Sequence, residues 1–466
     1  MPGTGVGTRA GVDGCANTAG CCGSVAPTAF DACCAPDASE KTTGKTGRLF
    51  LRGPGRTRMM TRPFATSGRT LIAAMCIGQI GNLLPNVVLS ANLAQHLMPA
   101  WGLSAAEGGL LASGYAGGYM LAVPVLTTLT DRIDARLVLL CGSVASGLAT
   151  IAFGMFAEGF WSAFVIWTLA GVGFAGAYMP GLKALTDRLP SGDTSRAVTL
   201  YTSSFSFGVG ISFLVAQVVA DRWGWRSAFV LTGTGPAVMA IVCMAMEART
   251  PEHKAGRLLD FKPVFANREA LGYILGYGSH CFELFGVRTW LVGFWTYVIG
   301  HQGAPAWMSP VVISFVFAIV SMPASILGNE AALKFGRHRA ITVVMLVSAV
   351  VALTIGLNAS APAWAVASLL LVYGLTVPAD SGALTAGMSA AATRDHRGAT
   401  LALHSAVGFG LSAAGSWSVG VALDFAGGPR NATGWLLAFI VLAMGIAMGP
   451  LALLWARSGG TKRWSR

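Results

Sequence analysis

Apolar residues gather in long runs that are separated by short polar connections. Twelve of these runs have the length of a helix that crosses a bilayer, about 20 residues. None of them alternates with the period of two that marks a membrane strand, so the pattern excludes a β-barrel. The predicted spans are 71–95, 108–129, 137–157, 160–182, 197–220, 227–245, 271–299, 308–328, 340–360, 362–389, 398–422 and 433–456.

The composition agrees with a chain whose surface faces lipid. Hydrophobic residues make up 54% of the 466 positions and charged residues 11%, against about 25% in an ordinary soluble domain. The mean hydropathy is +0.61. These values exclude a disordered chain and argue against a soluble enzyme. Because no HExxH, GxSxG or phosphate-loop motif occurs, we expect no enzyme activity, no cofactor and no metal site.

Lysine and arginine are unevenly distributed over the connections. If the N-terminus is cytoplasmic, 28 of the 32 lie on the cytoplasmic side, and Arg222, Arg226 and Arg430 alone lie in outside loops. Positive residues stay on the inner side of a membrane. The skew therefore predicts a multi-pass protein of a bacterial inner (plasma) membrane with both termini in the cytoplasm. It also accounts for the net charge of +12, so no nucleic-acid partner is expected.

Polar segments divide the chain into units. Residues 1–65 lack apolar periodicity and hold five of the nine cysteines without the spacing of a metal site, which predicts a disordered cytoplasmic tail. Met59 and Met60 offer an alternative start, in which case most of the tail is not translated. The predicted units are the tail 1–65, a first bundle 70–246, a cytoplasmic central loop 247–270, a second bundle 271–456 and a cytoplasmic tail 457–466.

The two sets of six spans carry related sequences. RAVTL at 196–200 enters span five, and RGATL at 397–401 enters span eleven. Pro180 and Pro378 lie near corresponding positions of spans four and ten. Two related halves of six helices are typical of transporters, whose binding site lies near the membrane midplane between the halves.

The connection after span two carries a family motif. It reads TTLTDRIDAR from Thr127 to Arg136 and resembles the Gly-x-Leu-Ala-Asp-Arg-x-Gly-Arg-Lys signature of the major facilitator superfamily. Asp131, Arg132 and Arg136 match, whereas Thr127 and Asp134 replace glycines. The resemblance implies an all-α membrane protein with twelve transmembrane helices in two pseudo-symmetric six-helix bundles. It also implies that Asp131, Arg132 and Arg136 belong to a cytoplasmic gate.

A second, less complete copy of the motif follows span eight. It reads GNEAALKFGRHR, lacks the aspartate, and by the same resemblance places Arg337 and Arg339 at the gate. The arginine of span four and the Gly-Pro motif of span five, which many antiporters of this superfamily have, are missing. Their absence disfavours a drug antiporter. Span seven resembles the branch of the superfamily that contains cyanate permeases and nitroimidazole transporters.

Span seven contains the main candidates for binding. It carries His280, Glu283 and Arg288, with Tyr277 on the same stripe as His280. An ionised group at the bilayer centre costs about 2.5–3.5 kcal/mol, so it needs a partner or a water-filled cavity. Arg288 offers a planar fork to a carboxylate-like anion, and Glu283 or His280 is a candidate carrier of a coupled proton. The alternative is a buried ion pair between Arg288 and Glu283 that only fixes helix packing.

Span one carries a polar stripe on one helix face, formed by Gln79, Asn82, Asn86 and Ser90. Amides that face lipid leave donors unsatisfied, so the stripe is expected to face the bundle. There it lines the substrate pathway or forms hydrogen bonds between helices. Pro85 permits a local kink.

Span ten carries the carboxyl group of Asp380, and span eleven carries the imidazole of His404. We expect Asp380 and His404 to lie toward the cytoplasmic side and to belong to the gate. The sequence leaves two pairings open, Asp380 with His404 or Asp380 with Lys183 of span four.

These features together predict a secondary active transporter that works by alternating access. We expect a monomer in the lipid bilayer that moves a small solute. The leading hypothesis is symport, in which a small organic or inorganic anion is taken up with protons. The alternatives are an exporter of small metabolites or drugs, and a transporter-like membrane receptor without net transport.

Overall fold

The computed structural model describes residues 68–189, 194–251, 261–393 and 396–458. The predicted tail 1–65 and residues 459–466 lie outside this part. Every regular element of the described residues is a helix. Eleven helical segments are long and apolar enough to cross a membrane, and α11 (Arg268–Gln302) adds a twelfth long helix of 35 residues. The predicted all-α membrane fold is confirmed.

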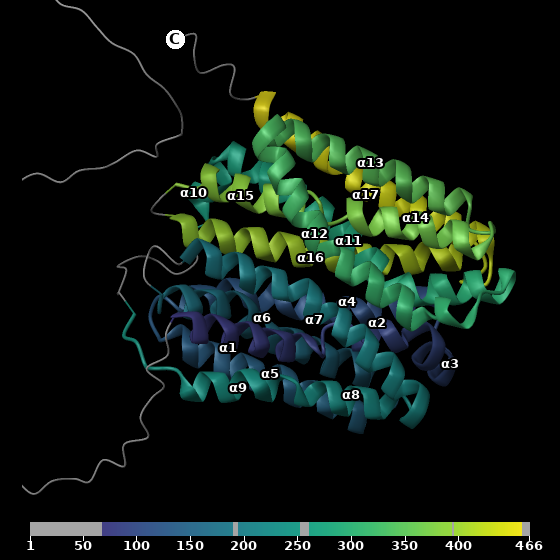
Figure 1. Ribbon diagram of the computed structural model, residues 1–466, viewed down its shortest axis with the longest axis horizontal. Coiled ribbons are helices and arrows are strands. Elements are labelled where there is room, and N and C mark those ends of the chain that lie inside the picture. Colours follow the sequence, from purple (N-terminus) through teal and green to yellow (C-terminus); the bar gives the residue numbers. More distant parts are fainter. Residues whose placement is uncertain (1–67, 190–193, 252–260, 394–395, 459–466) are drawn as a thin grey trace, which may run out of the picture. The chain divides into compact units, whose positions relative to one another are not determined.

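The first half of the helical body forms the lower layer in Figure 1. Its first span consists of four short pieces, one of them the π-helix η1, whereas α4 to α7 are long single helices. The elements are α1 (Gly68–Leu83), α2 (Val88–Asn92), η1 (Leu93–Leu97), α3 (Met98–Trp101), α4 (Ala105–Leu129), α5 (Ala135–Phe156), α6 (Phe160–Thr186), α7 (Thr194–Trp223), α8 (Trp225–Thr234) and α9 (Pro236–Ala245).

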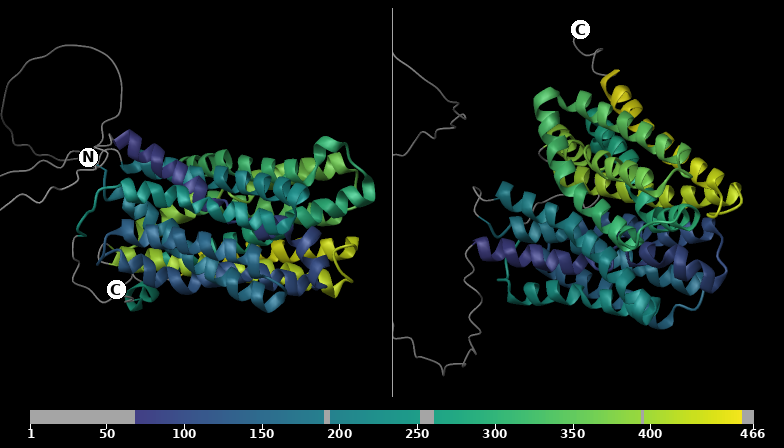
Figure 2. Two further views of the ribbon diagram at one scale, coloured as in Figure 1. Left: turned by 90° about the horizontal axis from the view of Figure 1, so that it is seen from below. Right: turned by 45° about the vertical axis from the view of Figure 1, so that its right-hand side comes forward.

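The second half forms the upper layer in Figure 1 and is separate again in the right-hand view of Figure 2. A short helix, α10, precedes the long α11. The further elements are α10 (Lys262–Ala266), the 3-10 turn η2 (Ala306–Met308), α12 (Pro310–Phe335), α13 (Arg337–Leu357), α14 (Ala363–Thr376), α15 (Ser381–Ala391), α16 (Arg397–Phe425) and α17 (Ala432–Ser458).

Besides a single turn residue, Gly235, between α8 and α9, two spans of the described residues are discontinuous. The chain leaves helical geometry between α1 and α2, at the kink that Pro85 predicts. The hydroxyl of Ser212 on α7 stabilises this break, because it donates to the Leu84 carbonyl at 2.6 Å and accepts from the Val87 N–H at 3.4 Å. The second break, between α14 and α15, was not predicted. It contains Pro378, which has no N–H to continue a helix.

The burial pattern is that of a protein in lipid. Large apolar side chains lie on the outside, with Trp161 75% and Leu357 72% exposed, while polar side chains such as Gln79 and Glu283 are fully buried. In water such an exposed apolar surface would drive aggregation, whereas a bilayer covers it. The chain is therefore a multi-pass membrane protein.

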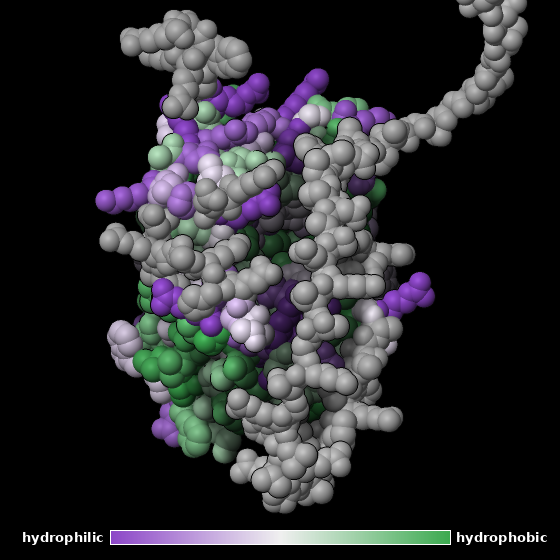
Figure 3. Space-filling view, turned by 90° about the vertical axis from the view of Figure 1, so that its left-hand side faces the viewer, coloured by the Kyte–Doolittle hydropathy of each residue, from purple (hydrophilic) through white to green (hydrophobic). Residues whose placement is uncertain are grey.

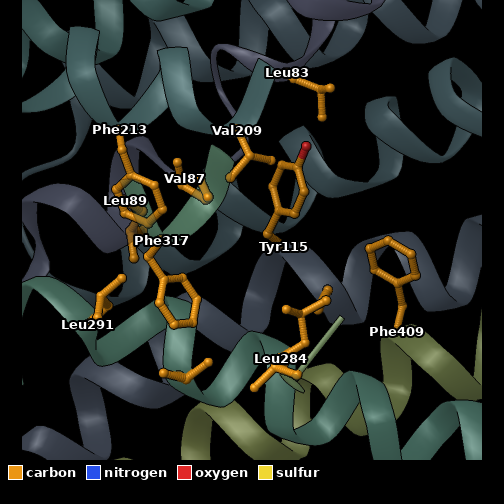
Figure 4. Packing of buried hydrophobic residues seen from close by; sticks show 14 of the residues in the cluster. Leu83, Val87, Leu89, Tyr115, Val209, Phe213, Leu284, Leu291, Phe317 and Phe409 are labelled. Atoms are coloured by element: carbon orange, nitrogen blue, oxygen red, sulfur yellow. The ribbon is translucent and has the colours of Figure 1, made fainter. Parts of the chain in front are cut away.

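The halves meet along three pairs of elements, in which α4 packs on α16, α7 on α12, and α2 with η1 on α11. The α4–α16 pair is so close that a Cβ at Gly420 would collide with the carbonyl of Ala105. Apolar side chains fill the contact between α7 and α12, where Figure 4 shows Phe213 of α7 and Phe317 of α12.

The two ends of the body differ in charge. We call the end where α1 begins the basic end, and it lies on the left of Figure 1. Figure 3 shows hydrophilic side chains gathered on the visible part of this end. The opposite end carries only Arg222, Arg226 and Arg430 among the described lysines and arginines. The basic end carries Arg69, Arg132, Arg136, Lys183, Arg188, Arg249, Lys262, Arg268, Lys334, Arg337, Arg339, Arg397 and Arg457.

Candidate functional site

A small cavity lies between the halves near the middle of the spans. Its volume is about 30 Å³. That space suits one or two water molecules, so an organic solute requires the cavity to widen. Its lining includes Asn86, Ser90, Tyr115 and Trp167 of the first half, and Phe285, Arg288, Thr289 and Ser416 of the second.

Arg288 is the charged residue of this cavity. It is 4% exposed, and its Nε and Nη1 atoms have no hydrogen-bond partner among the described residues. Its nearest aromatic contact is the ring of Phe285, whose centroid lies 5.9 Å from the guanidinium carbon. A buried cation without an anion is costly. The cavity therefore presents an unbalanced positive charge to whatever enters it.

The predicted alternative of an ion pair between Arg288 and Glu283 is wrong for the described structure, which contains no such salt bridge. The two residues are five apart on α11, which turns their side chains about 140° away from each other. The Glu283 side chain instead faces the helices α13 and α14 of its own half. Its Oε1 atom accepts hydrogen bonds from Ser348 at 2.9 Å and from Tyr373 at 3.0 Å.

His280 pairs with Asp380. The His280 Nδ1 and Asp380 Oδ1 atoms lie 2.7 Å apart, and the two side chains are 2% and 1% exposed. Asp380 immediately precedes α15 at the break in span ten. The sequence left open a pairing of Asp380 with His404 or with Lys183, and neither forms. Asp380 contacts His280, and Lys183 contacts Asp131 and Asp187.

His404 of α16 belongs to the same buried region. Its ring stacks on Tyr277 with centroids 3.9 Å apart, and Tyr277 stacks on His280 at 5.7 Å. The His404 Nε2 atom lies 3.4 Å from the Thr385 hydroxyl. The structure thus brings Tyr277, His280, Asp380 and His404 together inside the second half, although the sequence assigned the last two to a gate.

The polar stripe of span one faces the interior, as expected. Gln79, Asn82 and Asn86 are buried, and the Gln79 Oε1 accepts a hydrogen bond from Tyr201 at 2.8 Å. The other side-chain amide atoms of these three residues have no partner among the described residues. Asn86 lines the Arg288 cavity. The role of the stripe in a substrate pathway stays a prediction.

The sequence matches a family model. The model described as Major Facilitator Superfamily covers residues 75–416. The chain belongs to this superfamily. Its organisation in two halves of six spans, which the repeat and the motif predicted, agrees with that membership.

Curated relatives match only part of this facilitator. It is 29% identical over 158 residues to a gallate transporter of Pseudomonas putida, with 33% of this chain and 34% of that protein covered. It is 25% identical over 151 residues to a 4-hydroxybenzoate transporter of Acinetobacter baylyi, with 32% and 33% covered. Human protein spinster homolog 1 is 24% identical over 188 residues, with 40% and 35% covered. The match thus spans about a third of each relative.

The same fold occurs in a solved structure. A bacterial homologue of the human lysosomal transporter spinster, in an inward-facing and occupied conformation, aligns with a TM-score of 0.68. The alignment covers 85% of this chain and 98% of that chain at 18% sequence identity. At that identity the likeness concerns the fold alone.

The motif after span two forms a polar network at the basic end of this facilitator. Its centre is Asp134, one of the two residues that replace the glycines of the signature. Both Asp134 oxygens accept from Arg188 Nη2 at 2.8 Å, and the backbone N–H groups of Arg136 and Arg249 also donate to them. Burial alone raises the pKa of Asp134, but these hydrogen bonds outweigh it and lower the pKa below its ordinary value. Sequence reasoning missed this role, because Arg188 is 54 residues away.

The other motif residues are more loosely held. Asp131 lies 3.9 Å from Lys183 with 43% of its side chain exposed, and Arg132 is exposed. Arg136 donates to the Met246 carbonyl at 2.6 Å. Asp131, Asp134 and Lys183 line a cavity of about 210 Å³ at this end. Their function as a gate stays a prediction.

The second motif copy spans the end of α12 and the first turn of α13. Arg337 is half-buried and Arg339 exposed at the basic end. Between them, His338 Nδ1 lies 3.2 Å from the Tyr273 hydroxyl of α11. This copy therefore contacts the base of α11, and the gate role of its arginines also stays a prediction.

A contact at the opposite end was missed by the sequence. Asp424 of α16 accepts hydrogen bonds from the N–H groups of Ala105 at 2.9 Å and Ala106 at 2.7 Å, in the first turn of α4. These N–H groups have no partner within their own helix. A capping box of Ser104 and Glu107 forms at the same turn. The carboxylate of one half thus caps a helix of the other.

Proposed function

We propose that this chain is a secondary active transporter that carries a small organic anion by alternating access. The observation behind the proposal is the buried guanidinium of Arg288, which faces a cavity between the halves without an anionic partner among the described residues. A carboxylate can accept two parallel hydrogen bonds from such a fork. Bound there, the solute would neutralise the charge and contact both halves.

We propose small aromatic carboxylates as the substrate class. The side chains around Arg288 include the rings of Tyr115, Trp167 and Phe285, which suit a planar apolar body attached to a carboxylate. Two relatives are a gallate transporter and a 4-hydroxybenzoate transporter, and both solutes are aromatic acids. Asn86 and Ser90 supply polar groups for ring hydroxyls at the same cavity.

The proposal includes an orientation. We place the basic end in the cytoplasm of a bacterium and the opposite end outside its inner membrane, because positive residues are retained on the inner side. Both termini are then cytoplasmic, and the functional unit is a monomer. The resemblance of span seven to the cyanate permease and nitroimidazole transporter branch is part of the same proposal, since that branch also handles small polar solutes.

The test is exchange of labelled 4-hydroxybenzoate in proteoliposomes, with 4-hydroxybenzyl alcohol as the neutral competitor. We expect exchange of the acid and no competition by the alcohol. Arg288→Lys keeps the charge but loses the fork. A hydrogen bond to a charged group contributes about 1.5–3 kcal/mol, so this variant should bind the acid about 10- to 100-fold more weakly.

Arg430→Lys is the matched control, because Arg430 is exposed at the opposite end. It should exchange the acid like the wild type. Unchanged affinity of Arg288→Lys for the acid, or equal binding of the neutral alcohol, would remove the basis of the anion assignment. Binding without any exchange would indicate a receptor instead of a transporter.

A further inference from the structure

A second buried polar site lies apart from the Arg288 cavity, in the interior of the second half. Its core is the contact of 2.7 Å between His280 on α11 and Asp380 at the start of α15. Both side chains are at least 98% buried. Interrupted helices in transporters often mark the places where coupling ions bind, and Asp380 lies at such an interruption.

The charges around this pair are not balanced by fixed cations. The groups of α11 that face the pair are Tyr277, Cys281, Glu283 and, eight residues from His280, Arg288. Helix α16 contributes His404, and α14 contributes Tyr373, which donates to Glu283. No lysine or arginine of the described residues forms an ion pair with either carboxyl group.

The charge of this cluster indicates that it binds a cation. With both carboxyls ionised and both imidazoles neutral, the cluster would hold two negative charges in a dry interior, and the guanidinium of Arg288, eight residues along α11, would compensate at most one of them. An uncompensated buried charge is costly. Protons can balance the negative charges at the imidazole or carboxyl groups already in place. A transition-metal ion would need a set of His, Cys, Asp or Glu ligands, and the described residues contain no group of three or more arranged for one. Sodium, which oxygen atoms alone can bind, is left to the experiment.

We propose that the His280–Asp380 pair binds the proton that is coupled to anion transport. The proton is held by one of these two side chains, whose Nδ1 and Oδ1 atoms lie 2.7 Å apart, and it enters from one side of the membrane and leaves to the other in each cycle. This inference rests on the proposed function, because it supplies the coupling ion for the anion bound at Arg288. One monovalent anion moving with one proton carries no net charge, so a pH difference alone drives accumulation.

The geometry links the two sites through one helix. His280 and Arg288 are eight residues apart on α11, about 12 Å along its axis. A bound anion therefore favours the protonated pair electrostatically. At that distance and an effective dielectric constant of about 20, the Coulomb interaction amounts to about a tenfold effect of protonation on anion affinity.

The experiment separates coupling from binding. Proteoliposomes carrying the wild type receive labelled 4-hydroxybenzoate under equal pH, to measure exchange, and under an inside-alkaline pH difference, to measure accumulation. We expect both, with about tenfold accumulation for each pH unit and alkalinisation of the medium. Asp380→Asn and His280→Gln should keep exchange and lose accumulation. Asp221→Asn, an exposed aspartate at the opposite end, should keep both.

Each other outcome is decisive. Exchange by the wild type without proton movement, or accumulation driven by a sodium difference at equal pH, overturns the proton site, while the anion proposal stands. If Glu283→Gln loses accumulation while Asp380→Asn retains it, the proton binds at Glu283, and the proposal for the His280–Asp380 pair is overturned. If both pair variants fail to fold, Glu283→Gln decides: retained accumulation supports the His280–Asp380 pair, and lost accumulation overturns it. Absence of exchange in the wild type refutes the proposed function, and the inference falls with it.

Discussion

The hydrogen bonds that Asp424 accepts from the first turn of α4 predict that this residue stabilises the closed state of the opposite end. Asp424→Asn keeps the size of the side chain but removes its charge and one of the two acceptors used by Ala105 and Ala106. A hydrogen bond to a charged group contributes about 1.5–3 kcal/mol, and an anion at a helix N-terminus about 0.3–1 kcal/mol. Because Asp424 is partly exposed, we take the lower end, about 1.5 kcal/mol.

That free energy corresponds to about a tenfold shift of the equilibrium toward the state in which the opposite end is open. The assay is the distribution of distances between two spin labels in a cysteine-free background, one at Glu158→Cys and one at Arg430→Cys. These positions are exposed at the opposite end, in different halves. Asp424→Asn should increase the population at long distance, and Asp424→Ala should increase it further.

Asp221→Asn is the matched control, because Asp221 lies near the end of α7 in the first half, as Asp424 lies near the end of α16 in the second. It is exposed and forms no ion pair among the described residues. Its distance distribution should equal that of the wild type. An unchanged distribution in Asp424→Ala, or a shift toward shorter distances, would refute the idea that this cap holds the halves together.

Three further predictions concern stability. The pKa of Asp134 is lowered in the folded state, so its stabilising contribution is complete above the ordinary value of 3.8 and is lost as the pH falls through the lower folded value. The melting temperatures of wild type and Asp134→Asn should therefore differ at pH 5–7 and converge below pH 3.8. Gly171→Ala should destabilise by about 1–3 kcal/mol in thermal unfolding, since its Cβ would collide with a backbone carbonyl of α4, whereas Gly117→Ala meets open space. Because Glu283 and Arg288 form no ion pair with each other, Glu283→Ala should not rescue the stability lost in Arg288→Ala, and a rescue in the double variant would contradict the structure.

The spans were predictable because lipid imposes a single pattern on them. A run of apolar residues long enough to cross a bilayer has no other stable conformation there than a helix. Pro85 likewise marked the break in span one. The break at Pro378 was not predicted, since Pro124 and Pro180 lie within continuous helices. Proline alone does not distinguish a kink from an interruption.

The partners of the polar groups were harder to predict. Asp380 is 100 residues from His280, and which of several buried groups meet depends on how the helices pack, which hydropathy does not report. The same holds for Asp134 and Arg188, and for Asp424 and the first turn of α4. In each case the sequence indicates that a group needs a partner, while the packing selects it.

The spacing along α11 held information about its polar residues. At 3.6 residues per turn, Glu283 lies about 60° to one side of His280 and Arg288 about 80° to the other. That arrangement aims Arg288 at the cavity between the halves and Glu283 at α13 and α14, with His280 between them facing the break in span ten. One helix thus presents the guanidinium of Arg288 to the interface and the imidazole of His280 to the interior of its own half. Arg288 and His280 lie on the same helix, so a displacement of α11 relative to α15 would change both the lining of the cavity and the contact between His280 and Asp380.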